Sequence, residues 1–226
     1  ALVEMLLIRG AQPDLADSTG RTALFLAVSA GHPAVVKRLL AHKASPRKAT
    51  REGELPLHVA ATAGATRLVA LLLKAGAEID APTKTGFTPL MFAAQTGDAD
   101  TTRILLRAGA KPNDAQPKTG LTPLMIASAM AHAEAVDLML DQGANPNLVD
   151  ASGYSSLHRV VRDSDYGINP GSRDAVFTIV KSLLKHGANP NIRLVQDKEK
   201  AAEEIKNGNV QIEGKRSAVT VNEIIL

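Results

Sequence analysis

The chain contains no cysteine and no tryptophan, and aromatic residues make up only 3% of its 226 residues. Without cysteine it has no disulfide framework, no thiol nucleophile and no cysteine zinc site. With so few aromatic residues, alanine and leucine must fill the interior, which favours thin layers of helix packed on helix. The 45% of hydrophobic and 22% of charged residues are ordinary for a globular protein that buries a sizeable core.

Neither sign of charge dominates, because 26 basic and 23 acidic residues leave a formal net charge of +3. Such a small excess does not indicate a nucleic-acid partner, and we expect none. No stretch approaches the roughly 18 consecutive apolar residues of a bilayer-spanning helix, so we expect no membrane association. The lack of cysteine fits a reducing cytoplasm and an exported protein alike; we favour the cytoplasm, and export stays open.

What the sequence has in abundance is repetition. The glycine before a Thr-Pro-Leu-like motif recurs in steps of 33, 33, 34 and 33 residues, at Gly20, Gly53, Gly86, Gly120 and Gly153. A second series, Gly-Ala or Lys-Ala after a bulky apolar pair, follows the same period from Gly10 and lengthens to a step of 44 residues before Gly187. Self-similarity at a period of roughly 20–50 residues is typical of solenoid proteins.

The unit that contains TPLMFAAQTG shows the local structure that the repetition encodes. Thr88 is predicted to cap the start of a first helix, with Pro89 at the first helical position. Gly97 is placed to end this helix, and Gly109 to end a second helix over 99–109. Neither helix can bury its apolar face alone, so stacked units must share one core. The sequence therefore predicts an all-α solenoid of helix-turn-helix units joined by loops.

The pattern G-x-T-P-L-x-x-A-A-x-x-G, followed by L-L-x-x-G-A-x-x-N, resembles the ankyrin repeat. Residues 86–113 match it almost throughout, and 53–80 match it with Leu55 in place of threonine. The resemblance implies an ankyrin-repeat solenoid with finger loops over residues 1–192. Its expected parts are a partial repeat at 1–16 and repeats near 17–49, 50–81, 82–114, 115–148 and 149–192. Because the first part has only the features of a second half-repeat, we expect a fragment of a longer array. The GANPN form resembles bacterial arrays.

Two segments depart from the repeat pattern. The last repeat has an insertion at 164–174, which Gly167 and Pro170 mark as a loop, not an additional helix. It is either a tolerated surface insertion or a functional loop. Residues 193–226 form an irregular C-terminal segment, predicted to contain a short charged helix and a possible β-hairpin. We favour an enlarged loop of a further repeat there, and the alternative is a cap over the last apolar face.

The sequence holds partial likenesses to catalytic sites but no complete one, so we expect neither an enzyme nor a bound cofactor or metal. The stretch at 208–217 resembles a phosphate-binding loop, but its spacer is too long and its final serine or threonine is missing. Ser155, His158 and Asp163 are the residue types of a catalytic triad. The ankyrin resemblance instead implies that the first two, and likewise His58, tie repeats together by hydrogen bonds.

Ankyrin-like arrays bind other proteins in a concave groove lined by finger loops and first helices. The resemblance therefore implies a non-catalytic, monomeric interaction scaffold whose partner is another protein. The alternative is a targeting or regulatory array of a larger enzyme whose catalytic domain lies outside this sequence. Motif positions give the candidate partner-binding residues: Arg21, Arg51, Glu52, Lys84, Phe87, Gln95, Lys118, Leu121, Met130, Tyr154 and Arg162.

Two groups among these residues point to a mode of binding. Phe87 and Tyr154 belong to a chain with only four phenylalanines and two tyrosines, and an exposed aromatic finger residue is a natural anchor. The alternative is that both pack on the next finger. Basic residues recur about one repeat apart near the finger tips, which suggests an acidic partner surface or, alternatively, ordinary solvated side chains. These residues are Arg21, Arg51, Lys84 and Lys118.

Overall fold

The computed structural model describes residues 2–165 and 173–192, and these residues form helices joined by loops. The first helix, α1 (Leu2–Ile8), is followed by five helix pairs. The pairs are α2 (Ala23–Ser29) with α3 (Pro33–Ala41), α4 (Pro56–Thr62) with α5 (Thr66–Lys74), α6 (Pro89–Thr96) with α7 (Ala99–Arg107), α8 (Pro123–Ala129) with α9 (Ala133–Asp141), and α10 (Ser156–Asp165) with α11 (Arg173–Lys185). The predicted all-α solenoid is confirmed.

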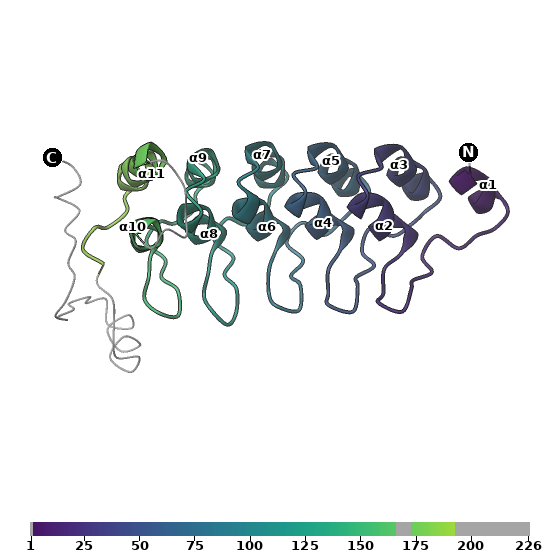
Figure 1. The fold of residues 1–226 in the computed structure, drawn as a ribbon, viewed down its shortest axis with the longest axis horizontal. Coiled ribbons are helices and arrows are strands. Elements are labelled where there is room, and N and C mark those ends of the chain that lie inside the picture. Colours follow the sequence, from purple (N-terminus) through teal and green to yellow (C-terminus); the bar gives the residue numbers. More distant parts are fainter. Residues whose placement is uncertain (1, 166–172, 193–226) are drawn as a thin grey trace.

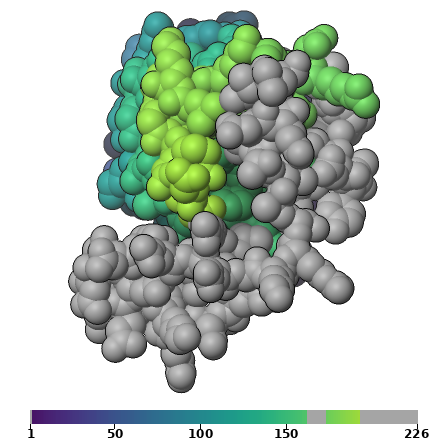
Figure 2. Space-filling view, turned by 90° about the vertical axis from the view of Figure 1, so that its left-hand side faces the viewer, coloured from purple at the N-terminus to yellow at the C-terminus, as the bar shows by residue number. Residues whose placement is uncertain are grey.

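The five pairs stack side by side into an elongated array (Figure 1). The first helices of the pairs pack on one another in one layer, and the second helices form the other layer. Long loops all extend from the side of the first helices, and their tips are the finger loops 17–21, 50–54, 83–87, 116–121 and 150–154. Viewed from the end that holds α10 and α11, the earlier repeats lie behind the last one (Figure 2).

The two layers share one core, and its composition reflects the scarcity of aromatic residues. Small side chains on the first helices let neighbouring repeats approach closely, while large aliphatic side chains on the second helices fill the space between layers. The buried alanines of the first helices are Ala27, Ala60, Ala61, Ala93, Ala94 and Ala127. The large residues at one equivalent position of the second helices are Leu39, Leu72, Leu105, Met139 and Leu183, none more than 2% exposed.

Local sequence signals set the ends of the helices. The Thr88 hydroxyl accepts a hydrogen bond from the backbone N–H of Met91 at 3.4 Å, which confirms the predicted cap of α6. Gly97 ends α6 with φ of 73°, a left-handed conformation that glycine adopts without strain. The second helix, α7, ends at Arg107, two residues before the predicted end at Gly109.

The last repeat corrects the prediction of a loop over 164–174. Helix α10 continues to Asp165, and α11 begins at Arg173. With 13 residues, α11 is longer than the nine-residue helices α3, α5, α7 and α9, so both ends of the insertion extend the flanking helices. Residues 166–172 lie outside the described part of the chain. The same holds for 193–226, with its predicted charged helix and β-hairpin.

One buried hydroxyl in α7 lacks a hydrogen-bond partner among the described residues. Thr102 is 0% exposed, and its Oγ1 atom accepts and donates no hydrogen bond there. Such an atom has lost its water without compensation, which costs stability. The other four second helices have valine at this position, namely Val36, Val69, Val136 and Val180. Valine has nearly the shape of threonine, so the site is built for an apolar side chain.

Replacing Thr102 by valine should therefore raise the free energy of unfolding by about 1–2 kcal/mol. Urea unfolding followed by far-UV circular dichroism measures the change. Thr178→Val is the control, because the Thr178 hydroxyl is exposed and donates to the Asp174 carbonyl oxygen at 2.7 Å. We expect no gain in stability from that variant. A Thr102→Val protein less stable than the wild type would show that the Thr102 hydroxyl has a polar partner.

Candidate functional site

Each finger loop is a tight turn that closes on itself through the backbone. In the third finger, for example, the N–H of Thr83 donates to the carbonyl oxygen of Phe87 at 2.9 Å. The glycine before the last finger residue has a positive φ, which is 85° at Gly86. A Cβ atom on Gly86 would lie 2.3 Å from Cδ of Pro117 in the next finger. Glycine is thus required both by the turn and by the close approach of the neighbouring repeat.

Backbone hydrogen bonds also join each finger to the next. The N–H of Arg51 donates to the backbone carbonyl oxygen of Thr19 at 2.9 Å, and the N–H of Lys84 donates to the backbone carbonyl oxygen of Glu52 at 3.0 Å. The equivalent residue of the fourth finger, Pro117, has no N–H. The side chain of Gln116 replaces it, since its amide Nε2 donates to the carbonyl oxygen of Thr85 at 2.6 Å. The fingers therefore form one continuous row, and a partner must recognise their side chains.

Gln116→Glu tests this substitute hydrogen bond, because glutamate keeps the acceptor oxygens and removes the amide donor. We expect the free energy of unfolding to fall by about 1–2 kcal/mol, since the Thr85 carbonyl loses its donor and faces a carboxylate. Pro117→Ala in the same background restores a backbone N–H and should recover part of the loss. Urea unfolding of the wild type, Gln116→Glu and the double variant measures these changes. A Gln116→Glu protein as stable as the wild type would show that the side chain of Gln116 does not replace the missing N–H.

Two histidines tie first helices to the following loops. His58 is 1% exposed; its Nδ1 accepts the backbone N–H of Leu55 at 2.9 Å, and its Nε2 donates to the Ala81 carbonyl oxygen at 2.7 Å. Burial lowers the pKa of His58, so the ring is neutral and carries its proton on Nε2. Burial also lowers the pKa of His158, whose Nδ1 lies 2.8 Å from the Ser155 hydroxyl.

The contact between Ser155 and His158 belongs to the start of α10. His58 makes the corresponding bond to Leu55, which has no hydroxyl, so the geometry requires no nucleophile. Ser155 is also only 1% exposed. Both observations favour the structural role that the resemblance implied.

Residues 2–165 and 173–192 contain no group of three or more His, Cys, Asp or Glu side chains placed to hold a metal ion. In the same part of the chain, no helix is both long and apolar enough to cross a bilayer.

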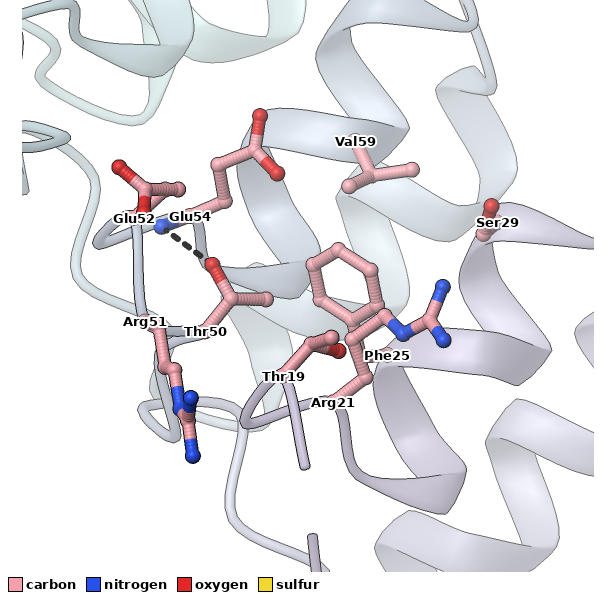
Figure 3. Close-up of a pocket in the computed structure, with 9 residues that line it drawn as sticks. All are labelled: Thr19, Arg21, Phe25, Ser29, Thr50, Arg51, Glu52, Glu54 and Val59. Carbon is pink, nitrogen blue, oxygen red and sulfur yellow. Dashed lines mark hydrogen bonds between the residues drawn. The ribbon is translucent and has the colours of Figure 1, made fainter. Parts of the chain in front are cut away.

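The finger loops and the adjacent faces of α2, α4, α6, α8 and α10 form what we call the inner surface. A hollow of about 490 Å³ lies at its N-terminal end, between α2, α4 and the first two fingers (Figure 3). Phe25 and Val59 supply apolar surface to the hollow, whose other residues are polar or charged. The residues that line it are Thr19, Arg21, Phe25, Ser29, Thr50, Arg51, Glu52, Glu54 and Val59.

The two arginines of the hollow differ in their availability. The Arg21 guanidinium pairs with the Asp17 carboxylate at 2.9 Å. Hydrogen bonds from the Thr19 hydroxyl and from the Arg21 backbone hold the pKa of Asp17 well below its usual range, so this pair stays charged. Arg51 is exposed, and its guanidinium points away from the Phe25 ring (Figure 3). Arg51 is thus free to meet a partner, whereas the charge of Arg21 is already compensated.

The two aromatic finger residues pack against first helices. The half-buried Phe87 ring lies 5.6 Å from the ring of Phe92 in α6, centroid to centroid. The Tyr154 ring lies 6.0 Å from the ring of His158 and 5.6 Å from the guanidinium carbon of Arg159, both in α10. Each aromatic side chain is therefore already held within the array.

An ion pair occupies the last repeat of the inner surface. Arg159 contacts Asp150 through Nε at 3.0 Å and through its terminal nitrogen, and the Asp150 side chain is 1% exposed. In the other first helices the position of Arg159 is apolar, with Leu26, Val59, Phe92 and Ile126. This one position of the first helices therefore changes from apolar to charged in the last repeat.

The other candidate residues are spread along the array. Glu52, Lys84 and Lys118 are exposed on their fingers, and Leu121 is half-buried. Gln95 and Met130 are exposed at the ends of α6 and α8. Arg162 is in α10, but its side chain is outside the described part. The hollow brings together only Arg21, Arg51 and Glu52 from the candidate set.

Sequence reasoning missed Phe25 and Val59. It assigned apolar residues at helical spacing to the core, and Phe25 is indeed only 7% exposed. The available signal was the position directly before the first buried alanine of α2, α4, α6 and α8. Val59 has this position in α4, and Leu26 has it in α2, where its side chain is 44% exposed.

Stacked helix pairs, linked finger to finger, define this protein as a helical repeat solenoid. A family model described as Ankyrin repeats (3 copies) matches residues 1–83, 64–150 and 90–194. The chain belongs to the ankyrin repeat family, as the sequence predicted.

One similar solved structure is the crystal structure of the ankyrin repeat domain of Bcl-3, a unique member of the IkappaB protein family. It shares 29% sequence identity at a TM-score of 0.72, over 85% of this chain and 82% of that chain. A search of the curated proteins gave no match. Nothing in these comparisons supports the bacterial type of array that the GANPN form predicted.

Proposed function

We propose that this chain is a non-catalytic interaction scaffold that binds a protein partner on its inner surface. Ankyrin repeats are in general protein–protein interaction modules, and their fold is typically non-catalytic. The observation that carries the proposal is the hollow between α2 and α4, where Phe25 and Val59 supply apolar surface amid polar and charged residues. Apolar surface surrounded by polar groups is the usual anatomy of a protein-binding surface.

Exposed cations that belong to no ion pair of the described residues lie on the inner surface, as they also do at Lys37 and Lys74 on the outer surface formed by the second helices. On the outer surface, charged side chains link neighbouring repeats: Arg103 contacts Glu134 at 2.9 Å, and Arg38 contacts Glu4 at 3.5 Å. On the inner surface, Arg51, Lys84 and Lys118 are exposed and belong to none of the ion pairs of the described residues. Side chains not used to hold the array together are available to a partner.

Leu26→Arg is the sharpest test, because Leu26 is 44% exposed and its replacement leaves the core intact. Phe87→Ala is less suitable, since the loss of its contact with Phe92 would lower stability as well as affinity. A partner captured with the wild-type chain is titrated against Leu26→Arg and against Lys74→Glu on the outer surface. We expect Leu26→Arg to weaken binding at least about tenfold and Lys74→Glu to change it less than about twofold.

Thermal melting of both variants serves as the control for folding, and neither should differ from the wild type by more than a few degrees. If Lys74→Glu abolishes binding and Leu26→Arg does not, the partner binds the outer surface and the proposal is wrong.

A further inference from the structure

The three central fingers each carry one exposed basic residue: Arg51, Lys84 and Lys118. Arg51 and Lys84 have the same place in their turns, and Lys118 follows Pro117, which has that place in the fourth finger. The first and fifth fingers have uncharged residues there, Ser18 and Ala151. Because Asp17 compensates the charge of Arg21, the basic row consists of the three central residues alone.

No acidic side chain of the described residues forms an ion pair with this row. The third finger, 83–87, and the fourth finger, 116–121, contain no acidic residue at all. Beside their cations lie the half-buried apolar side chains of Phe87 and Leu121. Glu52 and Glu54 belong to the second finger, where they line the hollow. The third and fourth fingers thus present uncompensated positive charge next to apolar surface.

Hydrogen bonds join the fingers of the row. The Lys84 backbone N–H donates to the Glu52 carbonyl oxygen at 3.0 Å, and the Gln116 side-chain amide donates to the Thr85 carbonyl oxygen at 2.6 Å, and both bonds oppose a separation of the fingers by repulsion between their cations. A preorganised row of like charges attracts an oppositely charged ligand and loses little entropy when it binds.

We propose that the second to fourth fingers bind an extended acidic segment of a partner protein. Its carboxylates would contact Arg51, Lys84 and Lys118, and an apolar side chain between them would pack on Phe87 and Leu121. The segment is extended because its charged groups must span three consecutive fingers. This inference rests on the proposed function and adds the chemistry of the partner and the fingers that select it.

Short fluorescein-labelled peptides test the inference by fluorescence anisotropy. One peptide alternates glutamate with leucine, a second alternates lysine with leucine, and a single-stranded DNA of similar length represents other polyanions. The wild-type chain should bind the acidic peptide at least about tenfold more tightly than either of the others. Its affinity should fall as salt is raised, because screening weakens contacts between exposed charges.

The charge-reversed variant combines Lys84→Glu with Lys118→Glu, and its matched control combines Lys37→Glu with Lys74→Glu on the outer surface. Both variants change net charge equally. The first should bind the acidic peptide at least about tenfold more weakly, and the control should stay within about twofold of the wild type. Thermal melting of both variants checks that the fold is retained.

Three results would overturn the inference. The wild-type chain would bind the lysine peptide as tightly as the acidic peptide, or it would bind the DNA as tightly as the acidic peptide. In the third, the outer-surface control would lose as much affinity for the acidic peptide as the charge-reversed variant. Failure of this inference is distinguishable from failure of the proposed function. If no acidic peptide binds but Leu26→Arg still weakens a captured partner, the inner surface is the binding surface and only the acidic segment is wrong. If inner-surface variants change neither partner binding nor peptide binding, the proposed function and the acidic-segment inference are both wrong.

Discussion

Replacing Leu105 by alanine should lower the free energy of unfolding by about 2–5 kcal/mol, among the largest effects of a single substitution in this chain. Leu105 is 0% exposed in α7, at the centre of the array. Its helix packs against α5 on one side and α9 on the other, so the vacated volume adjoins three repeats. Because each repeat is stabilised mainly by its neighbours, we also expect the unfolding transition to broaden.

Leu105→Met is the matched control, since α9 has Met139 at the equivalent position and buries it completely. Methionine fills a similar volume, and the loss should stay below about 1.5 kcal/mol. Urea unfolding by far-UV circular dichroism measures both variants. If the alanine and methionine variants lost equal amounts of unfolding free energy, the shape of the side chain, and not the cavity, would limit stability at this site.

Replacing His58 by alanine should cost about 2–4 kcal/mol of unfolding free energy, because one buried and one half-buried backbone group lose their partners at once. These groups are the N–H of Leu55 at 2.9 Å from Nδ1 and the carbonyl oxygen of Ala81 at 2.7 Å from Nε2. The second bond joins α4 to the loop that leads to the third finger, so its loss also weakens the connection between repeats. A loss below about 1 kcal/mol in urea unfolding would contradict this role.

The pH dependence of that loss supplies an independent check. Burial lowers the pKa of His58 in the folded chain, while the unfolded chain takes up the proton below about pH 6.5. The stability contributed by the neutral ring is therefore complete above the unfolded pKa, and it decreases as the pH falls towards the folded pKa. The difference in melting temperature between wild type and His58→Ala should shrink from about pH 7.5 to about pH 5. A growing difference would mean that the folded chain holds His58 protonated.

Local rules explain why so much of the fold was predictable from the sequence. The repeat period, the cap at Thr88 and the helix end at Gly97 each depend on residues a few positions apart, whose chemistry acts wherever the chain places them. The structural role of His58 was implied by the resemblance to the ankyrin repeat, and the structure shows that this side chain is buried. The ends of the insertion were mispredicted because the turn-forming Gly167 and Pro170 do not show how far the flanking helices continue.

The binding surface was predictable only as a set of positions, because its properties depend on contacts between side chains that the repeat pattern does not specify. Sequence alone determined that Arg21 and Arg51 lie near finger tips, whereas the tertiary structure decided that Asp17 compensates one and leaves the other free. The structure likewise shows that the half-buried Phe87 ring packs on Phe92, a contact that the sequence did not reveal. The period of the sequence determines which residues recur, and only the packing of neighbouring side chains determines which of them a partner can reach.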